Sequence, residues 1–206
     1  MGVGLLMLLV IESATAACSA ALIDAAGALI AERHEIVGRG HAERLVPMIE
    51  ELLAGARPAA ILVDCGPGSF TGVRVGLAAA HGLAIGWGVP LAGCSSLALL
   101  AVTAGRDEVA AALQGGHGEL FVQSYGGDPI APLDALLSLA PDAAAARIRA
   151  EAVVGPGAAA LVAARGYGIV IEKLPRAADA RLLPPALRGL PPKPIYGRPP
   201  DAKPMR

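Results

Sequence analysis

Four glycines mark the stretch Gly66-Pro67-Gly68-Ser69-Phe70-Thr71-Gly72-Val73-Arg74-Val75-Gly76, which follows the short apolar run Ile61–Cys65. Glycine permits the positive φ angles of a tight turn, and Ser69 or Thr71 can cap a following helix. The pattern predicts a buried strand over Ile61–Cys65 and a helix from about Ser69 to Gly86. Free N–H groups at such a helix start attract an anion or a partner's carboxylate, although the turn could simply be structural. The candidate functional residues of this loop are Gly66, Gly68, Ser69, Thr71 and Arg74.

Three known loop chemistries do not fit this stretch. A phosphate-binding P-loop needs a lysine at the helix start, and the first lysine of the chain is Lys173. A dinucleotide-binding fingerprint needs glycine where Thr71 stands. A nucleophile elbow around Ser69 needs glycine at the positions of Pro67 and Thr71.

The predicted helix carries very small side chains at every fourth position, Gly72, Gly76, Ala80 and Ala84. At 1.5 Å per residue, these positions form a stripe about 18 Å long. Such a stripe lets another backbone approach closely. Two interpretations stay open: close packing on the chain's own sheet, or a helix–helix interface with another subunit.

The segments around this helix predict an α/β fold. Leu5–Ile11, Cys18–Ile23 and Ala28–Ile36 are expected to form a three-stranded meander, and His41–Ala54 has the apolar spacing of an amphipathic helix. A strand over Val89–Ala92 and a helix over Ser95–Ala104 complete the order β-β-β-α-β-α-β-α. We therefore expect a mixed five-stranded sheet with helices on its faces.

The second half of the chain gives weaker signals. Glu108–Leu113 and Glu119–Tyr125 are typical of a hairpin, and Leu133–Leu139 is interpreted as a helix. A strand over Ala152–Val154 precedes Gly155-Pro156-Gly157 and a helix to about Arg165, which repeats the earlier strand, Gly-Pro-Gly and helix. The expected domains are a first lobe over 1–104, a smaller second lobe over 105–190 and a proline-rich extended tail over 191–206.

Composition excludes several classes of protein. The chain has 206 residues, 54% of them hydrophobic and 17% charged, so it can bury a sizeable core. Aromatic residues make up only 3%, which argues against a stacking surface for single-stranded nucleic acid. The net charge is −1, although the last quarter of the chain is basic, which indicates a solvated tail or a role beside RNA or a partner.

Two apolar stretches resemble membrane segments. The first, Leu5–Ile11, is not preceded by the basic residues of a secretory signal. The second, Val75–Gly105, is interrupted by glycines, a proline and His81. Neither is expected to be a membrane segment. The three cysteines, Cys18, Cys65 and Cys94, fit neither a zinc pattern nor a disulfide framework, so a cytoplasmic location is expected.

No catalytic group of residues is evident in the sequence. His41 has Leu45 four residues later, and His34 has Gly38, so neither begins a histidine metal-binding pair. Glu12 ends the first predicted strand, where sugar-kinase-like folds place an acidic residue near a metal-bound phosphate. We expect no catalytic residues, no metal site and no cofactor.

The segment from Gly66 to Leu97 resembles the bacterial TsaB family, the accessory subunits for threonylcarbamoyladenosine formation on tRNA. The matching residues also include the opening Leu9-Val10-Ile11-Glu12-Ser13-Ala14-Thr15, the helix His41–Leu53 and the ending Tyr196-Gly197-Arg198-Pro199-Pro200-Asp201-Ala202. The resemblance implies the actin/sugar-kinase/Hsp70-like (ASKHA) fold with two lobes. It also implies a cytoplasmic, non-membrane subunit that is not itself the catalyst.

The resemblance further implies specific partners. A TsaD-type subunit transfers the threonylcarbamoyl group to adenosine 37 of tRNA, a TsaE-type ATPase joins the assembly, and tRNA is contacted only through the complex. TsaB-type chains dock on TsaD through their first two helices and can pair with themselves over the same surface. The expected partner-interface residues are therefore His41, Leu45, Met48, Leu52, Gly72, Val73, Gly76, Leu77, Ala80 and Ala84.

The chain departs from the family pattern at two places. Gln114-Gly115-Gly116-His117 stands where Asp-Ala-Arg is usual, and Glu12 stands where aspartate is commoner. Two other functions remain as alternatives. One is a small-molecule phosphotransferase of the same fold, based on Glu12 and the turn from Gly66 to Gly72. The other is a metallopeptidase, for which the sequence offers no ligands.

Overall fold

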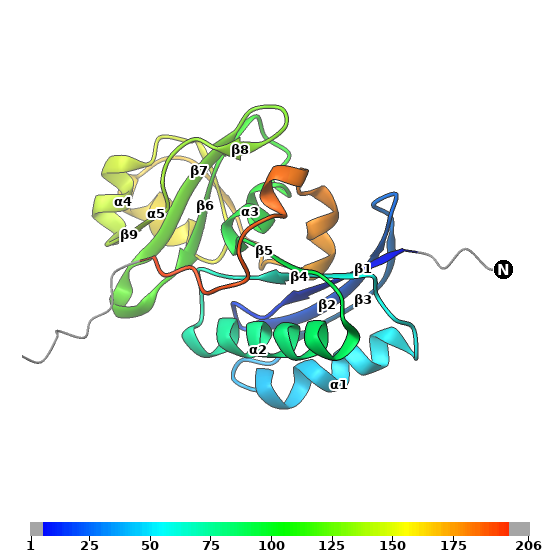
Figure 1. The fold of residues 1–206 in the computed structure, drawn as a ribbon. Helices are drawn as coiled ribbons and strands as arrows, with labels where there is room; N and C mark the ends of the chain where they lie inside the picture. Colours follow the sequence, from blue (N-terminus) through cyan, green and yellow to red (C-terminus); the bar gives the residue numbers. More distant parts are fainter. Residues whose placement is uncertain (1–5, 198–206) are drawn as a thin grey trace, which may run out of the picture.

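The computed structural model of the protein describes residues 6–197, which form two sheets with helices between and outside them (Figure 1). The first sheet has the strand order β3-β2-β1-β4-β5. Its strands are Met7–Glu12 (β1), Ala17–Asp24 (β2), Leu29–Ile36 (β3), Ala60–Asp64 (β4) and Leu91–Cys94 (β5). β2 is antiparallel to β1 and β3, whereas β1, β4 and β5 are parallel. The predicted mixed sheet and the predicted order of the first lobe are confirmed.

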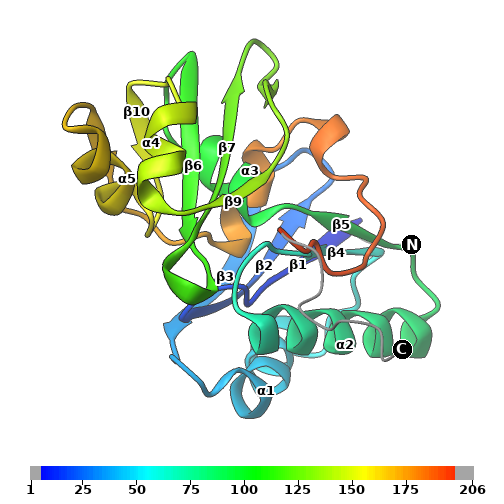
Figure 2. The same ribbon diagram turned by 90° about the vertical axis from the view of Figure 1, so that its left-hand side faces the viewer.

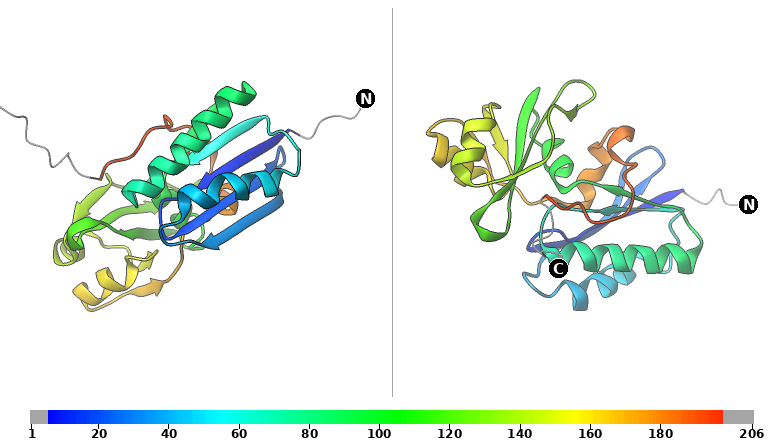
Figure 3. Two further views of the ribbon diagram at one scale, coloured as in Figure 1. Left: turned by 90° about the horizontal axis from the view of Figure 1, so that it is seen from below. Right: turned by 60° about the vertical axis from the view of Figure 1, so that its left-hand side comes forward.

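Both faces of the first sheet are covered, which explains the continuous apolar sequence of β1. Two long helices, His41–Leu53 (α1) and Phe70–Trp87 (α2), lie side by side on one face (Figure 3). The short helix Ser96–Ala101 (α3) and the 3-10 segment Ala177–Leu182 (η2) lie on the other face. Leu9 packs toward α1 and α2, and Val10 packs toward α3 and η2.

The second sheet has the order β11-β10-β6-β7-β8, and β9 also pairs with β7. Its strands are Glu108–Gln114 (β6), Leu120–Gly126 (β7), Ala131–Pro132 (β8), Leu137–Leu139 (β9), Ala152–Val154 (β10) and Ile169–Ile171 (β11). The helices Pro141–Arg147 (α4) and Ala158–Arg165 (α5) cover its outer face (Figure 2). Two further 3-10 segments are Gly116–Gly118 (η1) and Pro185–Leu187 (η3).

The two lobes share one hydrophobic core. Val10 and Leu62 of the first sheet, Leu99 of α3 and Val109 of the second sheet all belong to a single buried cluster. Leu183, which follows η2, belongs to the same cluster. The sheets are therefore packed together through α3 and η2 across a continuous apolar interior.

The structure differs from the sequence expectations in the second half of the chain. Residues 133–139 are not a helix; they contain β9, and Leu137 and Leu139 pair with Val122 and Leu120 of β7. The second lobe also ends earlier than residue 190, because η2 packs on the first sheet. Leu5 of the first predicted strand and residues 198–206 of the predicted tail lie outside the described residues.

The C-terminal strap, which we define as residues 190–197, has no helix or strand of its own and binds the first lobe. Leu190 and Gly93 exchange two backbone hydrogen bonds of 2.7 and 3.0 Å, beside β5. The N–H of Ile195 donates to the carbonyl of Cys65 at 2.8 Å. The strap therefore covers the β5 edge of the first sheet and runs along α2 (Figure 1).

Candidate docking interface

The glycine-rich loop between β4 and α2 packs against the loop that follows β1. Ser69 caps α2, because its Oγ accepts from the N–H of Gly72 at 3.2 Å. The N–H of Ser69 donates to the carbonyl of Ala14 at 2.6 Å, and a Cβ at Gly68 would clash with that same oxygen. Gly66 has a φ of +90°, which favours glycine. The N–H groups of Ser69 and Gly72 at the start of α2 are therefore taken by the chain's own oxygens.

The small-residue stripe of α2 also packs inside the chain. The Oγ of Ser13 donates to the carbonyl of Gly72 at 2.9 Å. A Cβ at Gly72 would clash with the carbonyl of Ser13, and a Cβ at Gly76 would clash with its Oγ. Ala80 is fully buried and Ala84 is 9% exposed. Of the two interpretations left open by the sequence, close packing within the chain is the one the structure shows.

The expected partner-interface residues therefore need correction, because the chain buries them in its own core. Their neighbours are one another and the strands of the first sheet, so they offer no face to another subunit. The Nε2 of His41 lies 3.0 Å from the carbonyl of Ala17. The whole expected set is buried: His41, Leu45, Met48, Leu52, Gly72, Val73, Gly76, Leu77, Ala80 and Ala84.

The outward side of α2 is uncharged and apolar, and sequence reasoning missed it. We call this side the crest of α2, and it consists of Thr71, Val75, Ala78, Gly82, Ile85 and Gly86, all exposed or half-exposed. Ile85 is 82% exposed, and no atom lies within 4 Å of a Cβ placed on Gly82 or Gly86. A second row of small residues, Ala78, Gly82 and Gly86, thus stands on the surface. The available signal was that α2 carries only two ionisable residues, Arg74 and His81, among eighteen, so that apolar and small residues cover more than one side of the helix.

The two ionisable side chains of α2, Arg74 and His81, each lie one helical turn before a crest residue. Arg74 donates to the hydroxyl of Tyr196 at 2.7 Å, and its guanidinium lies 3.2 Å from the centre of the Phe70 ring. The Nε2 of His81 lies 3.0 Å from the carbonyl of Pro192. Both side chains therefore bind the C-terminal strap. Phe70, at the first position of α2, is 69% exposed.

Two carboxyl groups lie buried at the carboxyl ends of the neighbouring parallel strands β1 and β4. Glu12 accepts from the N–H of Ala14 at 2.8 Å and from the Oγ of Ser19 at 3.1 Å. Asp64 accepts from the N–H of Gly66 at 2.8 Å and from the Oγ of Ser96 at 2.7 Å. Burial raises the pKa of both carboxyls, and the negative charge of Asp64 raises the pKa of Glu12 further.

A cleft of about 430 Å³ opens between the lobes beside the first turn of α2. Gln114 lies at its rim, and its Nε2 donates to the carbonyl of Pro156 at 3.3 Å. His117 lies in η1 at the tip of the β6–β7 hairpin, with a φ of 59°. The N–H groups of Gly155 and Gly157, in the second Gly-Pro-Gly turn, bond to the chain's own carbonyls at 2.9 Å. Of the unusual segment 114–117, Gln114, Gly115 and Gly116 therefore line the cleft, whereas His117 does not.

Residues 6–197 contain neither a metal-binding cluster of side chains nor a membrane-spanning helix. This part of the chain contains no group of three or more His, Cys, Asp or Glu side chains that could hold a metal ion. Within the same residues, no helix has both the length and the apolar character needed to cross a membrane.

The two packed sheets, with helices between and outside them, define a protein of the actin/sugar-kinase/Hsp70-like fold. A family model described as "TsaD: tRNA N6-adenosine threonylcarbamoyltransferase" matches residues 32–167. YeaZ from Pseudomonas aeruginosa has a similar solved structure, with a TM-score of 0.75 and 30% identity over 86% of this chain and 89% of that one. Together with the curated relatives named TsaB that are described next, these matches show that the chain belongs to the TsaB family.

Curated relatives agree with this assignment over different lengths. "tRNA threonylcarbamoyladenosine biosynthesis protein TsaB" of Escherichia coli is 35% identical over 57% of this chain and 54% of that protein. The protein of the same name from Haemophilus influenzae is 40% identical over 48% of this chain and 43% of that protein. This chain therefore spans about half the length of these two relatives. An uncharacterized protein of Mycobacterium tuberculosis is 31% identical over 96% of this chain and 94% of its own length.

Proposed function

We propose that this chain is a non-catalytic subunit in the synthesis of N6-threonylcarbamoyladenosine on tRNA. In this proposal it binds and supports a TsaD-type catalytic subunit, a TsaE-type ATPase joins the complex, and tRNA is reached through that complex in the cytoplasm. Family membership and the names of the E. coli and H. influenzae relatives support the pathway.

The observation that carries the docking role is the crest of α2. An exposed helix side with no charged group is unusual on a protein surface, and large exposed apolar patches mark interaction sites. Ile85 of the crest is 82% exposed, and Val46 on the neighbouring helix α1 is a further exposed apolar side chain, at 51%. Because Gly82 and Gly86 leave open space above the helix, a partner helix can approach the backbone of α2 closely. The same crest would also serve a second copy of the chain.

Co-purification of the chain with the TsaD-type subunit of the same organism tests this role. Gly82→Trp would fill the open space on the crest and is expected to abolish the complex without unfolding the chain. Ala163→Trp is the matched control, because Ala163 is an exposed small residue on α5 in the other lobe. If both variants co-purified like the unaltered chain, the crest would not be the docking face.

Glu12 and Asp64 are the observation that favours the alternative, a phosphotransferase. Paired carboxylates at the ends of parallel strands suit metal-bound phosphate chemistry, but here each accepts hydrogen bonds from the chain's own groups. The loops that follow the two strands are also bonded to each other, through the N–H of Ser69 and the carbonyl of Ala14. Calorimetry of the isolated chain with ATP and magnesium separates the two functions. We expect no heat of binding, and clear saturable binding would favour the phosphotransferase.

A further inference from the structure

The buried carboxyl groups of Glu12 and Asp64 lie where the first sheet meets the elements between the two sheets. They follow Val10 and Leu62 by two residues, so all four side chains point to the face of the first sheet that α3 and η2 cover. Their strands, β1 and β4, are parallel neighbours. Glu12 is fully buried and Asp64 is 1% exposed. The two carboxyls are therefore close together, out of contact with water.

Each carboxyl holds one of the two elements on this face through a serine. The Oγ of Ser19 donates to Glu12 at 3.1 Å and accepts from the N–H of Ala177, in η2, at 3.0 Å. The Oγ of Ser96, the first residue of α3, donates to Asp64 at 2.7 Å. Both serines are fully buried. We call Glu12, Ser19, Asp64 and Ser96 the carboxyl latch.

The two elements held by the carboxyl latch are those through which the chain passes between the lobes. The chain enters the second lobe from α3 and returns to the first sheet at η2, because α3 precedes β6 and η2 follows β11 (Figure 1). The latch therefore anchors the second lobe on both sides. The cleft of about 430 Å³ lies between the same lobes, so its width depends on their relative orientation.

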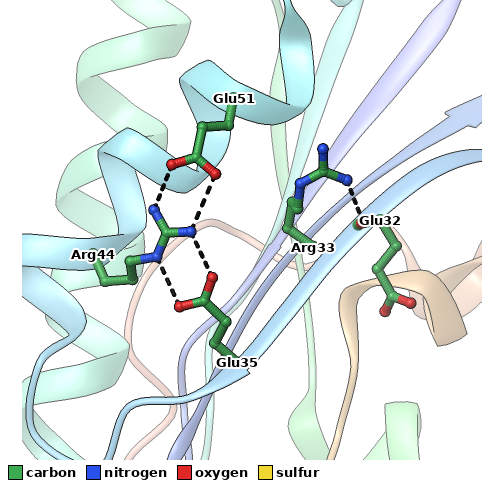
Figure 4. Close-up of polar contacts among 5 residues, drawn as sticks. All are labelled: Glu32, Arg33, Glu35, Arg44 and Glu51. Carbon is green, nitrogen blue, oxygen red and sulfur yellow. Dashed lines mark hydrogen bonds and ion pairs between the residues drawn. The ribbon is translucent and has the colours of Figure 1, made fainter.

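The cations near these elements are paired with other carboxylates. On the opposite face of the first sheet, Arg44 lies between Glu35 and Glu51, at 2.7 and 2.8 Å (Figure 4). The charged side chains around η2 form two further ion pairs: Arg176 with Glu32 at 2.6 Å, and Lys173 with Asp179 at 3.3 Å. Helix α3 has no ionisable residue. Within residues 6–197, no cationic side chain forms an ion pair with the carboxyl latch.

The other titratable groups near the carboxyl latch are thiols. Burial raises the pKa of Cys18, Cys65 and Cys94, and the charges of Glu12 and Asp64 raise it further. The thiols therefore stay neutral when the carboxyls titrate. With no cation present, a bound proton is what keeps one of two adjacent buried carboxyls neutral.

We propose that the carboxyl latch, while it holds a proton, fixes both passages of the chain between the lobes, and that loss of this proton to solvent releases the second lobe into a wider range of orientations. Two adjacent buried charges need solvation, so ionisation of the second carboxyl favours states in which α3 or η2 yields and water enters. The shared apolar core still holds the lobes together. This inference does not depend on the proposed docking role.

The test measures the orientation of the lobes by pulsed electron paramagnetic resonance on the full chain. Spin labels are placed on Glu50→Cys in α1 and Ala163→Cys in α5, which are exposed positions in different lobes, whereas the three native cysteines are buried. We expect a broader distribution of distances between the labels at about pH 8.5 than at about pH 5.5. This comparison requires no substitution in the latch.

Three variants identify the groups responsible. Glu12→Gln/Asp64→Asn carries no charge to lose and is expected to keep a narrow distribution at both pH values. Ser19→Ala removes the link to η2 and is expected to broaden the distribution at both. It should also lower the hydrogen-exchange protection factor of the Ala177 N–H about tenfold. Ser124→Ala, a buried serine of β7 outside the latch, is the matched control and is expected to behave as the unaltered chain does.

Three outcomes would overturn the inference. One is an equal distribution of distances at both pH values in the chain with an unaltered latch. Another is a pH-dependent broadening that persists in Glu12→Gln/Asp64→Asn, because a different group would then be titrating. The third is an equal loss of Ala177 protection in Ser19→Ala and Ser124→Ala, which would show a general loss of stability in place of a released contact.

Discussion

Gly72 and Gly82 lie on the same helix in opposite surroundings, which makes a matched pair of substitutions possible. A Cβ at Gly72 would clash with the backbone of Ser13, whereas a Cβ at Gly82 would meet nothing within 4 Å. We expect Gly72→Ala to lower the free energy of unfolding by about 1–3 kcal/mol through overpacking. Gly82→Ala should raise it by roughly 0.5–1 kcal/mol through helix propensity. Urea denaturation measures both, and equal effects would contradict the packing described for the stripe.

The buried carboxyls Glu12 and Asp64 predict a pH dependence of stability. Because their pKa is raised in the folded state, the unfolded chain releases these protons first as pH rises. The protonated pair therefore contributes stability that is present at about pH 4 and is lost as pH rises through the raised pKa. The free energy of unfolding falls by up to about 1.4 kcal/mol per pH unit for each proton.

Asp64→Asn removes one of these charges and preserves acceptors for Gly66 and Ser96. We expect its free energy of unfolding to fall less steeply than that of the unaltered chain between about pH 4.5 and pH 7.5. The opposite contributions of Glu35 and Glu51, whose pKa is lowered, are common to both proteins and cancel in the difference. Parallel pH profiles from chemical denaturation would show that the pair does not titrate as described.

At the level of single residues, the sequence indicated the loop and the residue that caps α2. It did not indicate which side of α2 faces the sheet. Ser69 caps α2 as predicted. The stripe of Gly72, Gly76, Ala80 and Ala84 is equally compatible with an internal and an external contact, because spacing alone does not say which side of the helix meets the sheet. The exposed row of Ala78, Gly82 and Gly86 has the same spacing and could be recognised only once the buried side was known.

Among the elements, the C-terminal strap has the clearest energetic role. It covers the β5 edge through Leu190, bonds Cys65 through Ile195 and binds Arg74 through Tyr196. Uncovered strand edges invite pairing with other chains. We expect a chain that stops after Gly189 to be less stable and to aggregate, whereas a chain that stops after Gly197 should retain these contacts and behave as the full chain. Thermal unfolding followed by light scattering tests this. If the two shortened chains unfolded and aggregated alike, the strap would not stabilise the fold.

Elements with strong local patterns were predictable, and elements created by distant pairing were not. The strands and helices of residues 7–101 follow their apolar spacing closely. Residues 133–139 have helical spacing, but their strand pairing with β7 prevails, and Asp134 fixes the turn by accepting from the N–H of Ser124 at 2.8 Å. Helix α4 is short and alanine-rich, with no periodic apolar face to indicate it, and η2 acquires its structure from packing on the first sheet.

Across the whole molecule, the shared core makes the two lobes one framework. Leu99, Val109 and Leu183 belong to the same buried cluster although they come from different parts of the chain. A framework of this kind holds the crest of α2 in a fixed orientation on one side of the first sheet. It suits a subunit that presents a rigid surface to a partner.

The central claim is that this chain supports a catalytic partner and makes no bond itself. The most direct measurement is formation of threonylcarbamoyladenosine on tRNA by purified TsaD-type and TsaE-type proteins, with a donor of the threonylcarbamoyl group supplied, in the presence and absence of the chain. We predict product only when the chain and both partners are combined, and none from the chain alone. Product from the chain alone, or full product without the chain, would contradict the account.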